Sequence, residues 1–195
     1  LDLGKVSTRN GPLLAATDEF EVTVRGRGGH AALPEKTVDP VVVAAHIVTA
    51  LQTIASRRTE PNDAVVVTVG AIHAGDAHNV IPDTAELRGT IRTLLPETRT
   101  MAEQEFRRIA RNTAAAFGAE AEITWHAGYP VTFNDEGATE HFRSVARSVL
   151  GDKAETHLVE KDKPTMGGED FSYYGHHCPA SFFLLGLIPD HMDVY

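Results

Sequence analysis

Hydrophobic periodicity along residues 17–128 constrains the fold of this chain more than any other feature of its sequence. Apolar and polar residues alternate over residues 19–25, which predicts a half-buried strand. Asp39 followed by Pro40 is a typical helix start, because aspartate accepts a hydrogen bond at the N-cap and proline suits the first helical position. Apolar residues then recur at helical spacing, and we expect this helix to end near residue 57.

The rest of this region contains three further predicted strands and a second predicted helix. The β-branched run at residues 64–69 predicts a well-buried strand, and alternation over residues 84–93 predicts another. A second helix is expected after Pro96, with an apolar stripe that includes Phe106 and Phe117, and with a glycine C-cap. Residues 119–126 alternate once more, which predicts the last strand.

The order is therefore strand, helix, strand, strand, helix, strand. This order predicts an α+β fold, a ferredoxin-like βαββαβ sandwich with both helices on one face of an antiparallel sheet. The flanking segments differ, because residues 1–16 are expected to be irregular. Further on, we expect a helix at residues 137–150, a short strand at 156–159 and an apolar strand at 181–187. This C-terminal segment is small for an independent domain, so we interpret it as part of something larger.

Composition excludes some classes of protein. The net charge of −9 argues against nonspecific nucleic-acid binding, which needs a basic surface. The single Cys178 excludes an internal disulfide and fits a reducing, cytoplasmic location. The longest apolar run, residues 40–47, is far shorter than the ~20 residues of a membrane span, so we expect no membrane partner. We expect no signal peptide, and the start at Leu1 suggests a trimmed piece.

Three residues of the first region are candidates for chemistry, each with a plainer alternative. His30, in the motif GRGGHAALP, could donate a hydrogen bond to an oxyanion or a carboxylate, or be an exposed loop histidine. Asn79, in HNVIPD, could simply be a turn asparagine. Arg92 could hold a substrate carboxylate with two hydrogen bonds, or lie solvated on the face of its strand. Local sequence alone favours the plainer reading for each.

The C-terminal segment carries further polar residues. Glu169 and Asp170 are adjacent in MGGEDF, where Asp170 could equally be a helix N-cap, and two adjacent carboxylates do not make a metal site. His176, His177 and Cys178 are consecutive, and successive side chains diverge in a helix or strand, so we expect no metal site there. The sequence contains no HExxH motif, paired CxxC, P-loop or nucleophile elbow.

Taken in order, GRGGHAALP, a helix opened by Asp-Pro, HNVIPDTAELRGTIRTL and MGGEDFSYY closely resemble the aminoacylase/carboxypeptidase family of metallopeptidases. The branch that is most similar is that of hippurate hydrolases and indole-acetyl-amino-acid hydrolases. The resemblance implies hydrolysis of the amide bond of N-acyl amino acids by a water activated at a two-metal centre of zinc, manganese or similar ions. It also implies a homodimer formed through a lid domain that is inserted in the catalytic domain.

The resemblance assigns a lid (dimerisation) domain to residues 17–128. Residues 1–16 and 129–195 would be a partial catalytic domain of the α/β zinc-peptidase-like type. In the lid, His30 is expected to be catalytic, as the group that stabilises the tetrahedral oxyanion, in many members across the dimer. Asn79 and Arg92 match lid positions that bind substrate or support the site.

In the partial catalytic domain, Glu169 matches a substrate-side position beside the metal centre. The family's first metal ligands and its general base lie upstream of the matched region, and its last histidine ligand lies after the apolar strand at residues 181–187. His191 lies near that place without a matching surrounding. We therefore expect this chain to bind no metal and to be inactive alone, with the hydrolase activity belonging to the full-length parent. The alternative is a non-catalytic dimerisation or small-molecule-binding module of a degenerate homologue.

Overall fold

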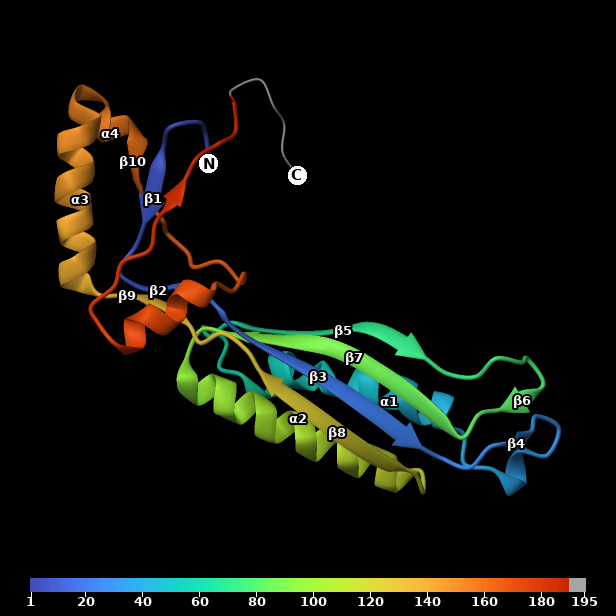
Figure 1. The fold of residues 1–195 in the computed structure, drawn as a ribbon. Coiled ribbons are helices and arrows are strands. Elements are labelled where there is room, and N and C mark those ends of the chain that lie inside the picture. Colours follow the sequence, from blue (N-terminus) through green and yellow to red (C-terminus); the bar gives the residue numbers. More distant parts are fainter. Residues whose placement is uncertain (190–195) are drawn as a thin grey trace. The chain divides into compact units, whose positions relative to one another are not determined.

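The computed structural model describes residues 1–189, and the chain divides into two compact units (Figure 1). We call Thr17–Gly128 the central unit, and Leu1–Ala16 together with Tyr129–Tyr195 the terminal unit. The elements of the central unit are β3 (Ala16–Arg25), β4 (Gly29–His30), η1 (Pro34–Lys36), α1 (Pro40–Leu51), η2 (Ile54–Arg58), β5 (Val65–His73), β6 (Val80–Ile81), β7 (Thr84–Thr93), α2 (Pro96–Ala116) and β8 (Glu120–Ala127).

Four strands of the central unit form one sheet, in the order β5-β7-β3-β8. Strand β5 is antiparallel to β7, and β3 is antiparallel to β8. Helices α1 and α2 pack against each other and cover one face of the sheet, with α1 against β7 and α2 against β7 and β8 (Figure 1). The predicted order of strands and helices is confirmed. The short strands β4 and β6 form a separate pair that extends from one end of the sheet (Figure 1).

Local signals in the sequence determine where the two helices begin and end. Asp39 is the N-cap of α1, and its carboxylate accepts a hydrogen bond from the Val41 amide at 2.8 Å, as its place before Pro40 predicts. Gly118 follows the end of α2 with a φ of 75°, a left-handed conformation that glycine adopts without steric cost.

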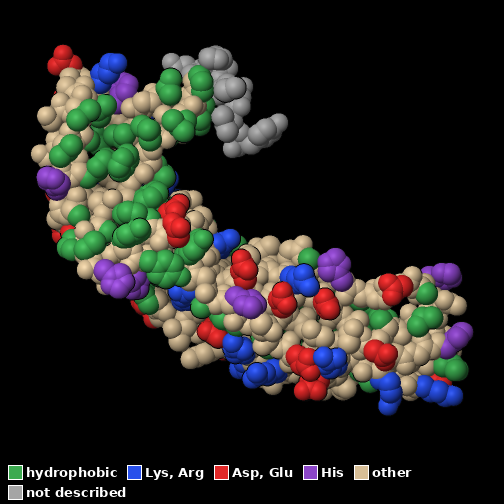
Figure 2. All heavy atoms as spheres, in the orientation of Figure 1, with side chains coloured by type: hydrophobic (Ala, Val, Ile, Leu, Met, Phe, Trp, Pro, Cys, Tyr) green, Lys and Arg blue, Asp and Glu red, His purple; other side chains and the backbone are tan. Residues whose placement is uncertain are grey.

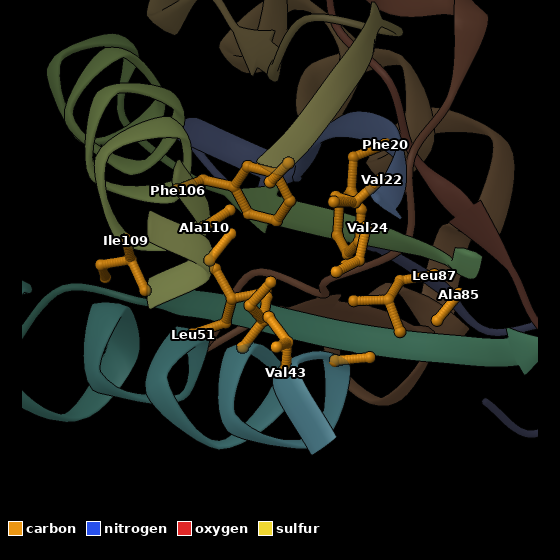
Figure 3. Close-up of a cluster of buried hydrophobic side chains, with 14 of the residues drawn as sticks. Phe20, Val22, Val24, Val43, Leu51, Ala85, Leu87, Phe106, Ile109 and Ala110 are labelled. Carbon is orange, nitrogen blue, oxygen red and sulfur yellow. The ribbon is translucent and has the colours of Figure 1, made fainter. Parts of the chain in front are cut away.

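The core of the central unit lies between the sheet and the two helices (Figure 3). Within it, Phe20 of β3 packs against Phe106 of α2, with 4.4 Å between the ring centroids. Truncating one such buried phenylalanine to alanine costs about 3–5 kcal/mol. The other buried side chains include Val22, Val24, Val43, Ile47, Leu51, Ile54, Leu87, Ile91 and Ile109.

Two predictions for the central unit are wrong. Strand β5 is not well buried, because it lies at an edge of a sheet that the helices cover on one face only, and Val66 is 39% and Ile72 is 50% exposed. Phe117 was expected in the apolar stripe of α2, but it lies just beyond the last turn and is 43% exposed. Its ring stacks on His46 of α1, with 4.7 Å between the centroids.

The helical stretch Pro40–Arg58 is long and apolar enough to cross a membrane, by length and composition alone, with a mean hydropathy of 1.2. This stretch is longer than the apolar run at residues 40–47, because the helical structure continues through uncharged polar residues such as Thr49, Gln52 and Thr53. Val43, Ile47 and Leu51 of this stretch lie in the core of the central unit. A core helix of a globular protein passes the same test of length and composition.

The terminal unit contains β1 (Val6–Thr8), β2 (Gly11–Leu14), β9 (Thr132–Asn134), α3 (Glu136–Leu150), η3 (Gly151–Lys153), α4 (Ala154–His157), β10 (Leu158–Glu160), η4 (Asp170–His176) and β11 (Leu184–Leu185). Strand β1 pairs in parallel with β10 and antiparallel with β11, and β2 pairs antiparallel with β9.

Several boundaries in the terminal unit differ from the predictions. Residues 1–16 are not irregular, because β1 and β2 form hydrogen bonds with strands that lie far away in the sequence. The short strand expected at residues 156–159 is Leu158–Glu160, and the strand expected at 181–187 is reduced to Leu184–Leu185. The helix expected at residues 137–150 is confirmed as α3. His191 lies outside the described residues.

Candidate functional site

The segments that carry His30 and Asn79 are neighbours at the tip of the central unit, which we define as β4, β6 and the loops around them (Figure 1). His30 is the register partner of Val80 in the short β4–β6 pair. The amide of Ala31 donates a hydrogen bond to the carbonyl oxygen of Asn79 at 3.1 Å. Two motifs that are far apart in the sequence therefore meet at one place on the molecule.

The glycine-rich loop before His30 is held tightly against the segment that precedes β7. A Cβ atom on Gly28 would lie 2.6 Å from the carbonyl oxygen of Ile81, so a side chain has no room there. The Gly28 amide donates a hydrogen bond to Asp83 Oδ1 at 2.8 Å. Asp83 is the last residue of the HNVIPD motif that contains Asn79, and it was not among the candidate residues predicted from the motifs.

The polar side chains at the tip are presented to solvent. His30 is exposed, and its Nδ1 atom accepts a hydrogen bond from the Ala32 amide at 3.1 Å. Asn79 is also exposed. Within residues 1–189, neither the His30 Nε2 atom nor the Asn79 carboxamide makes a hydrogen bond, so both groups are available to bind a ligand.

Arg92 lies at the opposite end of the sheet from the tip. It is the second-last residue of β7, a strand of ten residues whose first residue, Thr84, follows directly after Asp83. A strand rises ~3.3 Å per residue, so Arg92 lies about 25 Å or more from the tip. At this separation, Arg92 and His30 of one chain do not reach the same small molecule.

The guanidinium of Arg92 is half-buried and has no carboxylate partner among residues 1–189. Arg25 on the same face of the sheet differs, because it binds Glu122 through two hydrogen bonds of 2.7 and 2.8 Å. Those hydrogen bonds, followed by the charge of Arg25, lower the pKa of the Glu122 carboxyl below its ordinary value. Arg92 is thus free to form the paired hydrogen bonds that guanidinium groups make with carboxylates.

The face of the sheet away from the helices carries charged side chains of both signs (Figure 2). A shallow hollow of about 300 Å³ lies there, lined by Glu19, Phe20, Glu21, Gly70, Ala71, Arg88, Gly89, Thr90 and His126. Arg88 lies 3.8 Å from the Glu21 carboxylate and 3.6 Å from that of Glu86. None of the four candidate residues lines this hollow.

Glu169 belongs to the terminal unit, where it is the N-cap of the 3-10 helix η4. Its half-buried carboxylate accepts a hydrogen bond from the Asp170 amide at 3.2 Å. Asp170 is therefore not the helix N-cap that its sequence context allows. Glu169 is the N-cap, and Asp170 is the first residue of the helix. The capping role orders the turn that follows the glycines of MGGEDF.

Within the part of the chain that the structure describes, no three His, Cys, Asp or Glu side chains cluster closely enough to hold a metal ion. Cys178 is exposed, and its Sγ atom lies 3.6 Å from the carbonyl oxygen of Tyr174. The described residues therefore do not fit a two-metal centre, and no ligand of such a centre is assigned to them.

Comparison with known proteins identifies similar chains. The family model of the M20 class described as "Peptidase dimerisation domain" matches residues 17–117. N-acetyl-L-cysteine deacetylase of Bacillus subtilis is 41% identical over 189 residues, which cover 97% of this chain and 44% of that protein. IAA-amino acid hydrolase ILR1-like 2 of Arabidopsis thaliana is 38% identical over 191 residues, which cover 96% of this chain and 42% of that protein.

A solved structure from Bacillus subtilis, a dinuclear metal binding peptidase from the M20 family, matches with a TM-score of 0.73 and 33% identity. The match covers 95% of this chain and 45% of that protein. The chain thus spans less than half the length of these relatives.

Proposed function

Because the chain belongs to the M20 peptidase family, we propose that it is part of a metal-dependent amidohydrolase that cleaves the amide bond of N-acyl amino acids. The names of the relatives support this substrate class, since one is a deacetylase of N-acetyl-L-cysteine and another a hydrolase of IAA-amino acids. The observation that carries the proposal is the meeting of His30 and Asn79 at the tip of a unit that matches the peptidase dimerisation domain.

We assign the central unit as a ferredoxin-like lid (dimerisation) domain and the terminal unit as part of the catalytic domain. The exposed apolar side chains of the terminal unit support the second assignment, because a surface of this kind fits contact with further polypeptide (Figure 2). Phe133 is 58%, Leu185 is 55% and Leu187 is 72% exposed. In this proposal, the rest of the catalytic domain covers them.

The proposed dimer forms through α1 and β5. Residues 40–56 contain no Asp, Glu, Lys or Arg, although Val41 and Val42 on the outer face of α1 are 45% and 46% exposed. Strand β5 on the same side of the unit is a sheet edge, which can pair with a second copy. The outer face of α2 is unsuitable, since it carries ion pairs such as Arg108–Glu105 and Arg107–Glu103.

A dimer also resolves the separation between the tip and Arg92. One chain holds the two about 25 Å or more apart, by the rise of the strand between them. Two copies related by a twofold axis can place the tip of one copy near Arg92 of the other. We propose that each active site takes His30 and Asn79 from one copy and Arg92 from the second.

Each residue then has a role that fits its surroundings. His30 donates a hydrogen bond to the oxygen that becomes negative when the amide carbonyl is attacked. The unpaired guanidinium of Arg92 binds the carboxylate of the amino acid with paired hydrogen bonds. The carboxamide of Asn79 orients the substrate beside His30. Glu169 orders its turn on the substrate side of the site.

The divalent metal ions of the parent protein, zinc, manganese or similar, have no ligand assigned among residues 1–189. We therefore propose that this chain alone has no hydrolase activity and that the full-length protein does. The test is hydrolysis of hippurate by the full-length protein with added Zn²⁺ or Mn²⁺. We expect turnover that His30→Ala lowers by at least about 100-fold, the usual effect of removing an oxyanion donor.

The matched control is His141→Ala, which removes an exposed histidine of α3 and is expected to leave turnover unchanged. A full-length protein without turnover on any N-acyl amino acid with any of these metals would refute the proposal, and would favour a degenerate homologue that binds without cleaving.

A further inference from the structure

We propose that Asp83 is a positioning residue for His30, and that the tip holds the imidazole so that its Nε2–H group faces outward as a hydrogen-bond donor. The consequence for catalysis rests on the proposed function of His30. The positioning itself is a property of the folded tip and can be measured without turnover.

The orientation of the imidazole follows from the group that contacts Nδ1. That group is the backbone amide of Ala32, at 3.1 Å, and a backbone N–H can only donate. Nδ1 must therefore be the acceptor, which leaves the proton of the neutral ring on Nε2. The turn is closed by a second hydrogen bond, from the Leu33 amide to the His30 carbonyl oxygen at 2.9 Å.

Asp83 binds the glycine-rich loop that precedes His30 through two hydrogen bonds. Its carboxylate accepts the Gly28 amide at 2.8 Å, and its carbonyl oxygen accepts the Gly26 amide at 2.9 Å. Gly28 is pressed so closely on this segment that a Cβ atom would lie 3.0 Å from Asp83 Oδ1. The next two residues of the loop are β4, so the contacts of Asp83 fix where His30 enters the β4–β6 pair.

The side chain of Asp83 is exposed, so its removal leaves no cavity in the core. A change in the position of His30 in an Asp83 variant would therefore report on the hydrogen bond to the loop, and not on loss of packing. A donor held ready in this way can meet a developing oxyanion without rearrangement, which is the usual condition for effective stabilisation.

The experiment compares amide hydrogen exchange by NMR in the 195-residue chain and in three variants. In Asp83→Ala, we expect exchange of both the Gly28 and the Ala32 amides to become faster by at least about tenfold, because the second amide is bound to the imidazole itself. Asp83→Asn keeps an oxygen acceptor and should restore slow exchange at both amides. The control Asp76→Ala removes an exposed carboxylate of the same region that has no hydrogen-bond partner among residues 1–189, and should change neither.

A purely local role for Asp83 would accelerate exchange at Gly28 and leave Ala32 unchanged, and that result would overturn the proposal. So would the absence of a scalar coupling across the hydrogen bond between the Ala32 nitrogen and His30 Nδ1. In the full-length enzyme, we expect Asp83→Ala to lower kcat by about tenfold or more with little change in KM, since misplacing a catalytic group by ~1 Å can cost ~100-fold. If the exchange results hold while His30→Ala leaves kcat unchanged, the proposed function fails and the positioning inference stands.

Discussion

Replacing Val42 by aspartate should separate the proposed dimer while the fold of the central unit is retained. Val42 lies on the outer face of α1, where it is 46% exposed in the isolated chain. The substitution therefore does not disturb the core, which is formed by the inner residues of the same helix, such as Val43 and Ile47. In a dimer built on α1, the same position is buried against the second copy, and a carboxylate there loses its hydration.

The size of the effect follows from the exposed fraction. Burying a whole valine side chain is worth about 1.5–3 kcal/mol, and about half of Val42 remains to be buried, so each copy contributes roughly 1 kcal/mol. Both copies lose this term, and each aspartate adds a desolvation cost of at least ~1 kcal/mol. The total of at least ~4 kcal/mol corresponds to a dimer Kd that is more than ~500-fold weaker.

Sedimentation equilibrium of the 195-residue chain over a range of concentrations measures this Kd directly. Val42→Ala removes only methyl groups and adds no charge, so it should weaken the dimer by at most about 30-fold, the part due to the lost apolar burial. The matched control is Val149→Asp, which places the same charge at an 80% exposed valine of α3 and should leave the Kd unchanged. If Val42→Asp leaves the Kd unchanged, or if Val149→Asp weakens the dimer equally, the interface does not lie on α1.

Three further predictions concern stability and titration. Gly89→Ala should destabilise the fold by about 3 kcal/mol or more in urea unfolding, because the new Cβ atom would lie 2.0 Å from the Thr68 carbonyl oxygen. An unchanged urea midpoint of unfolding would contradict this packing. Arg99→Ala should lower the free energy of unfolding by about 3 kcal/mol in the same assay, because the 2% exposed Asp18 carboxylate loses its bidentate partner. A decrease of less than ~1 kcal/mol would show that this ion pair contributes little to stability. The Glu122 carboxyl should titrate at a lower pH than an ordinary glutamate, and Arg25→Ala should raise its pKa by NMR titration, whereas an unchanged value would rule out their pairing in solution.

The elements that could be predicted are those whose signals are local. Asp39 and Pro40 start α1 through a hydrogen bond that spans two residues, and Gly118 follows the end of α2 through its own backbone conformation. Strand β7 has the predicted bounds, Thr84–Thr93, because its alternation matches a sheet with one buried face. In each case, the residues that determine the structure lie beside one another in the sequence.

The elements that could not be predicted depend on partners that lie far away in the sequence. Strand β1 exists because it pairs with β10 and β11, more than a hundred residues later, and its three residues are too few to show a strand pattern of their own. Strand β5 has the composition of a buried strand, but its place at the sheet edge leaves one face exposed, and composition does not encode strand order.

The same division applies to the candidate site. The motifs pointed to His30 and Asn79, and the β4–β6 pair brings the two together. Their distance from Arg92 depends on the direction of β7, which motif order does not reveal. The contact of Asp83 with Gly28 spans 55 residues, so only the structure shows that this carboxylate holds the loop of His30.

The most direct test of the whole account mixes two inactive variants of the full-length protein. His30→Ala and Arg92→Ala dimers are unfolded together, refolded and assayed for hydrolysis of an N-acyl amino acid. If each site takes His30 from one copy and Arg92 from the other, half of the dimers are mixed and each has one intact site, so about a quarter of the wild-type activity should return. If the mixture is no more active than the two separate variants, the two residues do not share a site across the dimer, and the central claim is wrong.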